Sequence, residues 1–198
     1  MDFLVFRNTI INSLIKYDVD YTLFGGAVVN IFNNLRETSD LDLTIKADEE
    51  SLLAFLAALE DVNYGTIEEL LKQITDAFQA ELDSPYSEFN GAEEFNMYTG
   101  GYALVSGNPE YDGLHIDLCF NIGEHNFDTM QSEEYIHDGI KINMVSLRYL
   151  IKMKANINKG YGGPRPQDIE DIKFLAEKLN LDPSTGQPKN KLSQMNKF

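Results

Sequence analysis

The stretch FGGAVVNIFNNLRETSDLDL, residues 24–43, constrains the fold more than any other part of the sequence. Residues 20–24 predict a short strand that runs into a glycine pair, Gly25 and Gly26. We expect the pair to form a tight turn into a helix, because glycine adopts backbone conformations that other residues avoid. Apolar residues then recur at helical spacing through residues 27–35, and residues 36–39 break that pattern. The stretch therefore predicts a strand, a turn, a helix and a second strand in succession.

The second strand carries two acidic side chains on one face. Apolar and polar residues alternate through DLDLTI, residues 40–45, as in a strand with one buried face. Asp40 and Asp42 therefore share a face, about 6 to 7 Å apart along the strand. Their carboxylates could converge on one or two divalent cations, and magnesium prefers such hard oxygen ligands. Backbone N–H groups of Gly25 and Gly26, ahead of a helix, could approach an anion. The spacing predicts a combined phosphate and metal site.

The rest of the chain predicts a mixed α/β fold. Helical spacing predicts helices at 3–16, 48–59 and 66–82, the last two with Asp48 and Thr66 as N-caps. Residues 84–91 predict a loop, and 96–121 a hairpin whose returning strand is GLHIDLCF. A strand at 138–145 and helices at 147–159, capped by Ser146, and 167–180 follow. Strands interleaved with helices favour a mixed sheet over a purely parallel one.

Composition limits the partners. The chain has 198 residues and a net charge of −16, which indicates one compact domain, with or without a small appendage. A protein that coats duplex DNA needs a basic surface, so duplex DNA is excluded as a partner. No apolar run approaches the roughly 20 residues that span a bilayer, and no secretory signal is apparent. With a single cysteine, Cys119, the chain is expected to be soluble and cytoplasmic, with no membrane partner.

The segment GGAVVNIFNNLRETSDLDL resembles the signature of the nucleotidyltransferase superfamily with the polymerase-beta-like fold. In that signature a Gly-Gly or Gly-Ser turn and a short helix precede Asp-x-Asp on the next strand. The Arg-x-Thr-x-Asp-Leu-Asp-Leu form is most similar to the branch of abortive-infection toxin nucleotidyltransferases and small-molecule-modifying relatives. Downstream, LIKMKANINKGYGGPRPQDIEDIKFL is similar to that branch's helix pair, with Gln167 in place of a lysine.

The resemblance implies the fold class and the division of the chain. The expected fold is α/β (α+β), a mixed, mostly antiparallel sheet of the nucleotidyltransferase type with flanking helices and a C-terminal helix pair. The core would span residues 1–144, with a helical insert at about 48–91 for which the resemblance names no counterpart. A helical extension at 145–182 would pack on the core, and residues 183–198 would form a flexible tail.

The resemblance also implies the centre of the site. Gly25 and Gly26 would hold the nucleotide phosphates, and Asp40 and Asp42 would bind magnesium. The family uses a third carboxylate from a neighbouring strand, for which Asp117 is expected. Asp117 sits mid-strand in an apolar context, where a metal would offset the cost of an unpaired charge. Asp112, in a turn-like Tyr-Asp-Gly setting, is the alternative.

Basic residues of the family pattern fall at two further places. Lys154 matches the lysine that approaches the triphosphate, with Lys152 as the competing assignment. Arg165 matches the turn that follows it and is expected to bind the nucleotide. Asp168, in the same turn, would orient Lys154 or cap the last helix.

The loop ahead of the acidic strand supplies two more candidates. Arg36 and Thr38 would steady the metal loop, or Thr38 would contact phosphate. His115 shares the face of Asp117 on the returning strand but is expected to be structural rather than catalytic.

The activity implied is magnesium-dependent nucleotidyl transfer from a nucleoside triphosphate to a hydroxyl-type acceptor by a two-metal mechanism, with manganese as an alternative to the two magnesium ions. Asp40, Asp42 and Asp117 would carry the catalysis. The acceptor stays open between a small molecule, a protein and a tRNA. The alternative is a weakly active or inactive module of this fold that serves a toxin-antitoxin pair or another protein partner.

Overall fold

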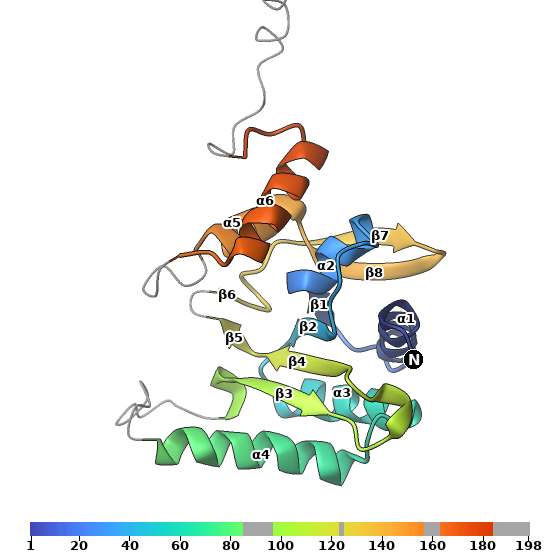
Figure 1. The fold of residues 1–198 in the computed structure, drawn as a ribbon. Helices are drawn as coiled ribbons and strands as arrows, with labels where there is room; N and C mark the ends of the chain where they lie inside the picture. Colours follow the sequence, from blue (N-terminus) through green and yellow to red (C-terminus); the bar gives the residue numbers. More distant parts are fainter. Residues whose placement is uncertain (85–96, 123–124, 157–162, 184–198) are drawn as a thin grey trace, which may run out of the picture. The chain divides into compact units, whose positions relative to one another are not determined.

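The computed structural model describes residues 1–84, 97–122, 125–156 and 163–183 (Figure 1). It divides into two compact units, Met1–Val145 and Ser146–Phe198. The first unit contains the sheet and the glycine turn, and the second contains a pair of helices. Within the described ranges, no helix is both long enough and apolar enough to span a membrane.

A six-stranded mixed sheet organises the first unit, in the order β3-β4-β2-β1-β8-β7 (Figure 1). The β1–β8 and β2–β4 pairs are parallel, and the other three pairs are antiparallel. This confirms the predicted mixed, mostly antiparallel α/β fold. The elements are α1 (Phe3–Lys16), β1 (Tyr21–Leu23), α2 (Gly25–Phe32), β2 (Asp40–Ile45), α3 (Glu49–Asp61), α4 (Ile67–Asp83), the short 3-10 helix η1 (Met97–Thr99), β3 (Gly101–Val105), the 3-10 helix η2 (Pro109–Tyr111), β4 (His115–Cys119), β5 (Asn121–Ile122), β6 (His125–Asn126), β7 (Ser132–His137) and β8 (Ile140–Val145).

Local capping fixes the helices that follow β2. The Asp48 carboxylate accepts from the backbone N–H of Ser51, at 2.8 Å, and begins α3. Thr66 and Glu69 form a reciprocal capping box at the start of α4. Both predicted N-caps are therefore confirmed. Each cap satisfies backbone N–H groups that have no partner inside the helix.

Alternation along β2 and β4 separates the core from the candidate site. Leu41 and Leu43 of β2 are fully buried, as are Ile116 and Leu118 of β4. The side chains between them, on the opposite face, are half-buried. Helix α3 packs against two other helices, α1 and α4. Apolar burial thus fixes the register that sets the polar face.

Two boundaries around the glycine turn were wrong. Helix α2 begins at Gly25 rather than at residue 27, so the glycines make the turn and start the helix at once. It ends at Phe32 rather than at residue 35. Leu35 is 86% exposed, so no burial compensates a longer helix at that end.

The sequence did not predict the edge strand β7. Its residues are exposed almost throughout and show no apolar alternation, so the usual signal is missing. The predicted hairpin is confirmed as β3–β4, although it begins at Gly101. Most of the predicted loop at 84–91 and of the predicted tail at 183–198 lies outside the described residues.

The second unit is a pair of packed helices, α5 (Leu147–Asn156) and α6 (Pro166–Lys178). The hydroxyl of Ser146 accepts from the backbone N–H of Tyr149, at 3.3 Å, which confirms the predicted cap. Arg165 occupies the N-cap position of α6, ahead of Pro166. Proline suits this first turn because its missing N–H would have had no helical partner.

Candidate functional site

Parallel pairing of β2 with β4 gathers the predicted acidic residues on one face. Asp40 lies opposite His115, and Asp42 lies opposite Asp117. Because neighbouring residues of adjacent strands point to the same side, the three predicted carboxylates share one surface. Asp112, the alternative third carboxylate, instead follows η2 in an exposed turn.

The Gly25–Gly26 turn lies directly against Asp42. Gly25 has a φ of +66°, and a Cβ built there would lie 2.0 Å from Oδ2 of Asp42. The backbone N–H of Gly26 donates to the same oxygen at 3.2 Å. The Asp42 carboxylate therefore occupies the N-terminus of α2, where the helix dipole and open N–H groups favour negative charge. Only glycine permits this approach at position 25.

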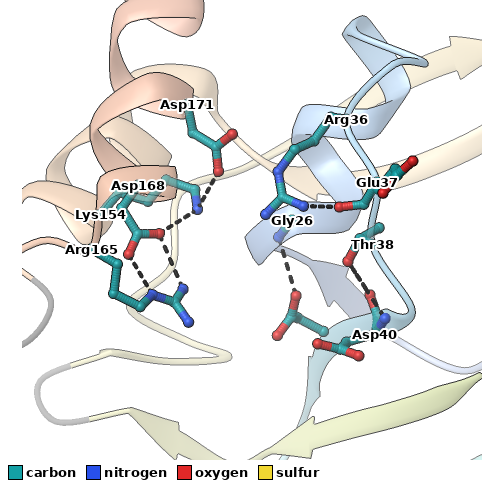
Figure 2. A network of polar contacts seen from close by, with 10 residues as sticks. Gly26, Arg36, Glu37, Thr38, Asp40, Lys154, Arg165, Asp168 and Asp171 are labelled. Atoms are coloured by element: carbon teal, nitrogen blue, oxygen red, sulfur yellow. Dashed lines mark hydrogen bonds and ion pairs between the residues drawn. The ribbon is translucent and has the colours of Figure 1, made fainter.

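Arg36 and Thr38 pack around the same turn (Figure 2). A Cβ on Gly26 would lie 3.1 Å from the Thr38 hydroxyl oxygen and 3.2 Å from Nη2 of Arg36. The Arg36 guanidinium also donates to the backbone carbonyl of Glu37. Thr38 Oγ1 lies 3.5 Å from the backbone nitrogen of Asp40. The structure thus brings both predicted loop residues to the turn between Gly26 and the start of β2.

Asp40 is held by two neighbours. Its Oδ1 accepts from the Ser39 hydroxyl at 2.6 Å and lies 2.7 Å from Nε2 of His115. Ser39 comes from the adjoining loop, whereas His115 comes from β4. Both side chains of the Asp40–His115 pair are partly exposed, at 40% and 36%.

Two groups of the face have shifted acidities. Burial and the charge of Asp40 raise the pKa of the Asp117 carboxyl, and His115 offsets part of this rise. Burial, together with the charges of Asp42 and Asp117, raises the pKa of the Cys119 thiol to about 12. Burial and the negative charge of this face therefore disfavour the ionisation of Asp117 and of Cys119.

Across the described ranges, no three histidine, cysteine, aspartate or glutamate side chains are grouped to hold a metal ion. The contacts above give a physical reason for this, because Asp42 points to Gly26 and Asp40 to Ser39 and His115. The three aspartates nevertheless offer the hard oxygen donors that magnesium prefers. The donor chemistry fits the ion, while the side chains adopt other contacts.

A cavity of about 540 Å³ borders the loop that holds Arg36 and Thr38. Its other walls come from α1, α2 and the β7–β8 turn, and they include the fully buried Arg7. None of the three aspartates lines it. The cavity is therefore a neighbour of the candidate site and does not contain its acidic centre.

In the second unit, the predicted lysine is enclosed by carboxylates (Figure 2). The Lys154 ammonium lies 2.9 Å from Asp168 and 2.8 Å from Asp171, and the Lys154 side chain is 7% exposed. Arg165 donates to Asp168 through Nε, at 2.7 Å, while its own side chain is 61% exposed. Burial acts to raise the pKa of Asp168, but hydrogen bonds and charges from Arg165 and Lys154 outweigh it and lower this pKa to about 2.

These contacts decide between two sequence alternatives. Asp168 binds Lys154 and is not the side-chain cap of α6. Lys152, the competing lysine, is exposed on the same helix.

Sequence reasoning missed the contact of Ser39 with Asp40 and set His115 aside as structural. The signal was available for both, since Ser39 precedes Asp40 and His115 lies two residues before Asp117 on one strand face.

Comparison with known protein families gives a match that spans most of the chain. The model of the AbiEii family, described as nucleotidyl transferase AbiEii toxin of a type IV toxin-antitoxin system, matches residues 12–192. No curated protein sequence matches the chain.

Solved structures give weaker similarity. An antigenic nucleotidyltransferase-like protein from Paracoccidioides brasiliensis is 19% identical, with a TM-score of 0.48 over 87% of this chain and 74% of that chain. The antibiotic-resistance factor ANT(2'')-Ia is 11% identical, with a TM-score of 0.46 over 87% of this chain and 81% of that chain. Neither TM-score reaches 0.5, so the match to the family model alone carries the assignment.

Proposed function

Because the chain belongs to the AbiEii family of nucleotidyl transferase toxins, we propose that it transfers a nucleoside monophosphate from a nucleoside triphosphate to an acceptor hydroxyl. The acceptor oxygen would form a bond to the α-phosphorus, the bond from that phosphorus to the bridging oxygen would break, and pyrophosphate would leave. The observation that carries the proposal is the register of β2 and β4, which aligns Asp42 with Asp117 beside the Gly25–Gly26 turn.

Asp40, Asp42 and Asp117 would hold magnesium, or manganese in its place. When bound, the ions would supply positive charge that lowers the pKa of the acceptor hydroxyl and neutralises the leaving pyrophosphate. Support comes from the raised pKa of Asp117, which is due first to burial and then to the negative charge of Asp40 on this face. A cation offsets that repulsion and keeps all three carboxylates ionised.

The other residues of the turn would receive the triphosphate. Its phosphates would take the position at Gly26 N–H that Asp42 fills here, and Asp42 would turn toward the metal. Arg36 and Thr38 lie against Gly26 and would add donors to the phosphates. Asp117, on the strand beside Asp42, would accept the proton of the acceptor hydroxyl.

The basic residues of the second unit divide into two roles. Two carboxylates already enclose the Lys154 ammonium, so Lys154 would hold α5 against α6. The guanidinium of Arg165 is more exposed and, of the two, is the better candidate for phosphate binding. Lys154 would contact the triphosphate only after leaving Asp168 and Asp171.

A second function is favoured by the same enclosure of Lys154 and by the contacts that occupy Asp40 and Asp42. In that case the chain is a weakly active or inactive module of a toxin-antitoxin pair or of another protein complex. The acceptor, whether a small molecule, a protein or a tRNA, matters only for the first function.

Calorimetric titration of each nucleoside triphosphate, with and without magnesium, separates the two functions. We expect magnesium-dependent binding by the wild type and none by the Asp40→Asn/Asp42→Asn variant. The matched control is Asp76→Asn/Asp83→Asn, which removes two exposed carboxylates of α4 and keeps the same net charge as the test variant. If the wild type binds no triphosphate, the transferase proposal fails and the partner module stands.

A further inference from the structure

One oxygen of the Asp40 carboxylate makes both of the side chain's polar contacts with the residues that the structure describes. Ser39 donates to Oδ1 at 2.6 Å, and Nε2 of His115 lies 2.7 Å from the same atom. Oδ2 has no hydrogen bond or ion pair with any residue that the structure describes. The side chain is 40% exposed, so the carboxylate is partly open to solvent.

The two donors restrict a torsion that is otherwise soft. The terminal torsion of an aspartate has broad minima, so a partly exposed carboxylate on a strand turns easily. Two short contacts on Oδ1, one from the adjoining loop and one from β4, restrict the rotation of the carboxylate. His115 reaches it because the β2–β4 register places the two residues opposite each other.

We infer that His115 is a positioning residue, which with Ser39 holds Asp40 so that Oδ2 faces the catalytic cation. The inference rests on the proposed function, since it assigns a partner to one of the proposed magnesium ligands. Metal sites commonly orient their ligands in this way, through hydrogen bonds made by the ligand's other atom.

The same contact engages one ring nitrogen of His115. Nε2 lies 2.7 Å from Oδ1 of Asp40, so this atom is not open to the cation. Through Nε2, His115 acts on Asp40.

Substitution separates the donor from the volume of the side chain. His115→Gln keeps an N–H donor at a similar reach, and His115→Leu removes the donor while filling the space. Ser39→Ala removes the second donor without touching the sheet. The matched control is His137→Leu, because His137 also has Nε2 near a carboxylate, 3.5 Å from Asp138, in the turn between β7 and β8.

The test is Mn²⁺ binding to the full-length, nucleotide-free protein, followed by electron paramagnetic resonance, with circular dichroism as a check of folding. We expect His115→Leu to weaken binding by about tenfold, and Ser39→Ala to weaken it several-fold. His115→Gln should stay within about threefold of the wild type, and His137→Leu should match it.

The outcomes distinguish the inference from the function on which it depends. Equal Mn²⁺ affinity in the wild type, His115→Leu and Ser39→Ala overturns the inference and leaves the metal site intact. Equal losses in His115→Gln and His115→Leu overturn it as well, because the donor would then be irrelevant. If the wild type binds no Mn²⁺, the proposed metal site fails and the inference fails with it. Should His115→Leu not fold, a loss in Ser39→Ala supports the inference and unchanged affinity overturns it.

Discussion

Replacing Gly25 by alanine tests the close approach of the turn to Asp42. The substitution has two costs that can be worked out from the structure. Alanine at a φ of +66° costs about 1 to 2 kcal/mol, because its Cβ crowds the backbone in the left-handed region. The new Cβ would also lie 2.0 Å from Asp42 Oδ2, so the carboxylate must move away.

Moving the carboxylate breaks its hydrogen bond with the Gly26 N–H. A hydrogen bond to a charged group contributes about 1.5 to 3 kcal/mol. We therefore expect Gly25→Ala to lower the free energy of unfolding by about 2.5 to 5 kcal/mol. For a chain of this length, that corresponds to a fall in Tm of about 11 °C at the midpoint of the range.

Gly113→Ala is the matched control. Gly113 also has a positive φ, of +75°, but nothing lies within 4 Å of a Cβ built there. Only the backbone cost applies, so we expect a loss of about 1 to 2 kcal/mol and a fall in Tm of about 4 °C. Thermal and urea unfolding followed by circular dichroism compare the two variants. Equal losses in Gly25→Ala and Gly113→Ala would refute the close contact with Asp42.

Two further predictions concern the ion pairs of the second unit. Lys154→Met should lower the free energy of unfolding by about 3 kcal/mol, because it leaves the Asp168 and Asp171 carboxylates buried without their shared ammonium. Urea unfolding measures this against Lys152→Met, an exposed change on the same helix, and comparable losses would contradict it. The second prediction is a loss of stability in acid. The pKa of Asp168 is about 2 in the folded chain, against an ordinary 3.8. The ionised Asp168 therefore stabilises the fold fully above a pH of about 4, and this stabilisation disappears as the pH falls toward 2. Arg165→Gln should weaken this dependence by raising the pKa of Asp168, and identical calorimetric profiles from pH 5 to pH 2 would argue against it.

Much of the fold followed from local patterns in the sequence. The alternation in β2 and β4 and the caps at Asp48 and Thr66 have local causes, so the sequence predicted them. The strand β7 could not be predicted, because an exposed edge strand shows no apolar period. The early end of α2 depends on what covers Leu35, which only the tertiary structure determines.

The candidate site divides in the same way. Spacing indicated that Asp40 and Asp42 belong together, and the family resemblance implied Asp117 as the third carboxylate. The β2–β4 register places the three on one face. The sequence could not indicate the partner of each side chain. That Asp42 meets Gly26, and Asp40 meets His115, depends on rotamers and on the register of strands distant in the sequence.

The parallel pairing of β2 with β4 also sets the order in which the site can assemble during synthesis. The segment between these strands contains α3, α4 and β3. A nascent chain that has emerged only as far as α4 carries Asp40 and Asp42 without Asp117. Closing this long segment has an entropy cost that local contacts do not offset, so pairing of β2 with β4 is expected late in folding. A nascent chain that ends before β4 therefore has only two of the three carboxylates of the candidate site. If synthesis stops there, the released fragment lacks Asp117.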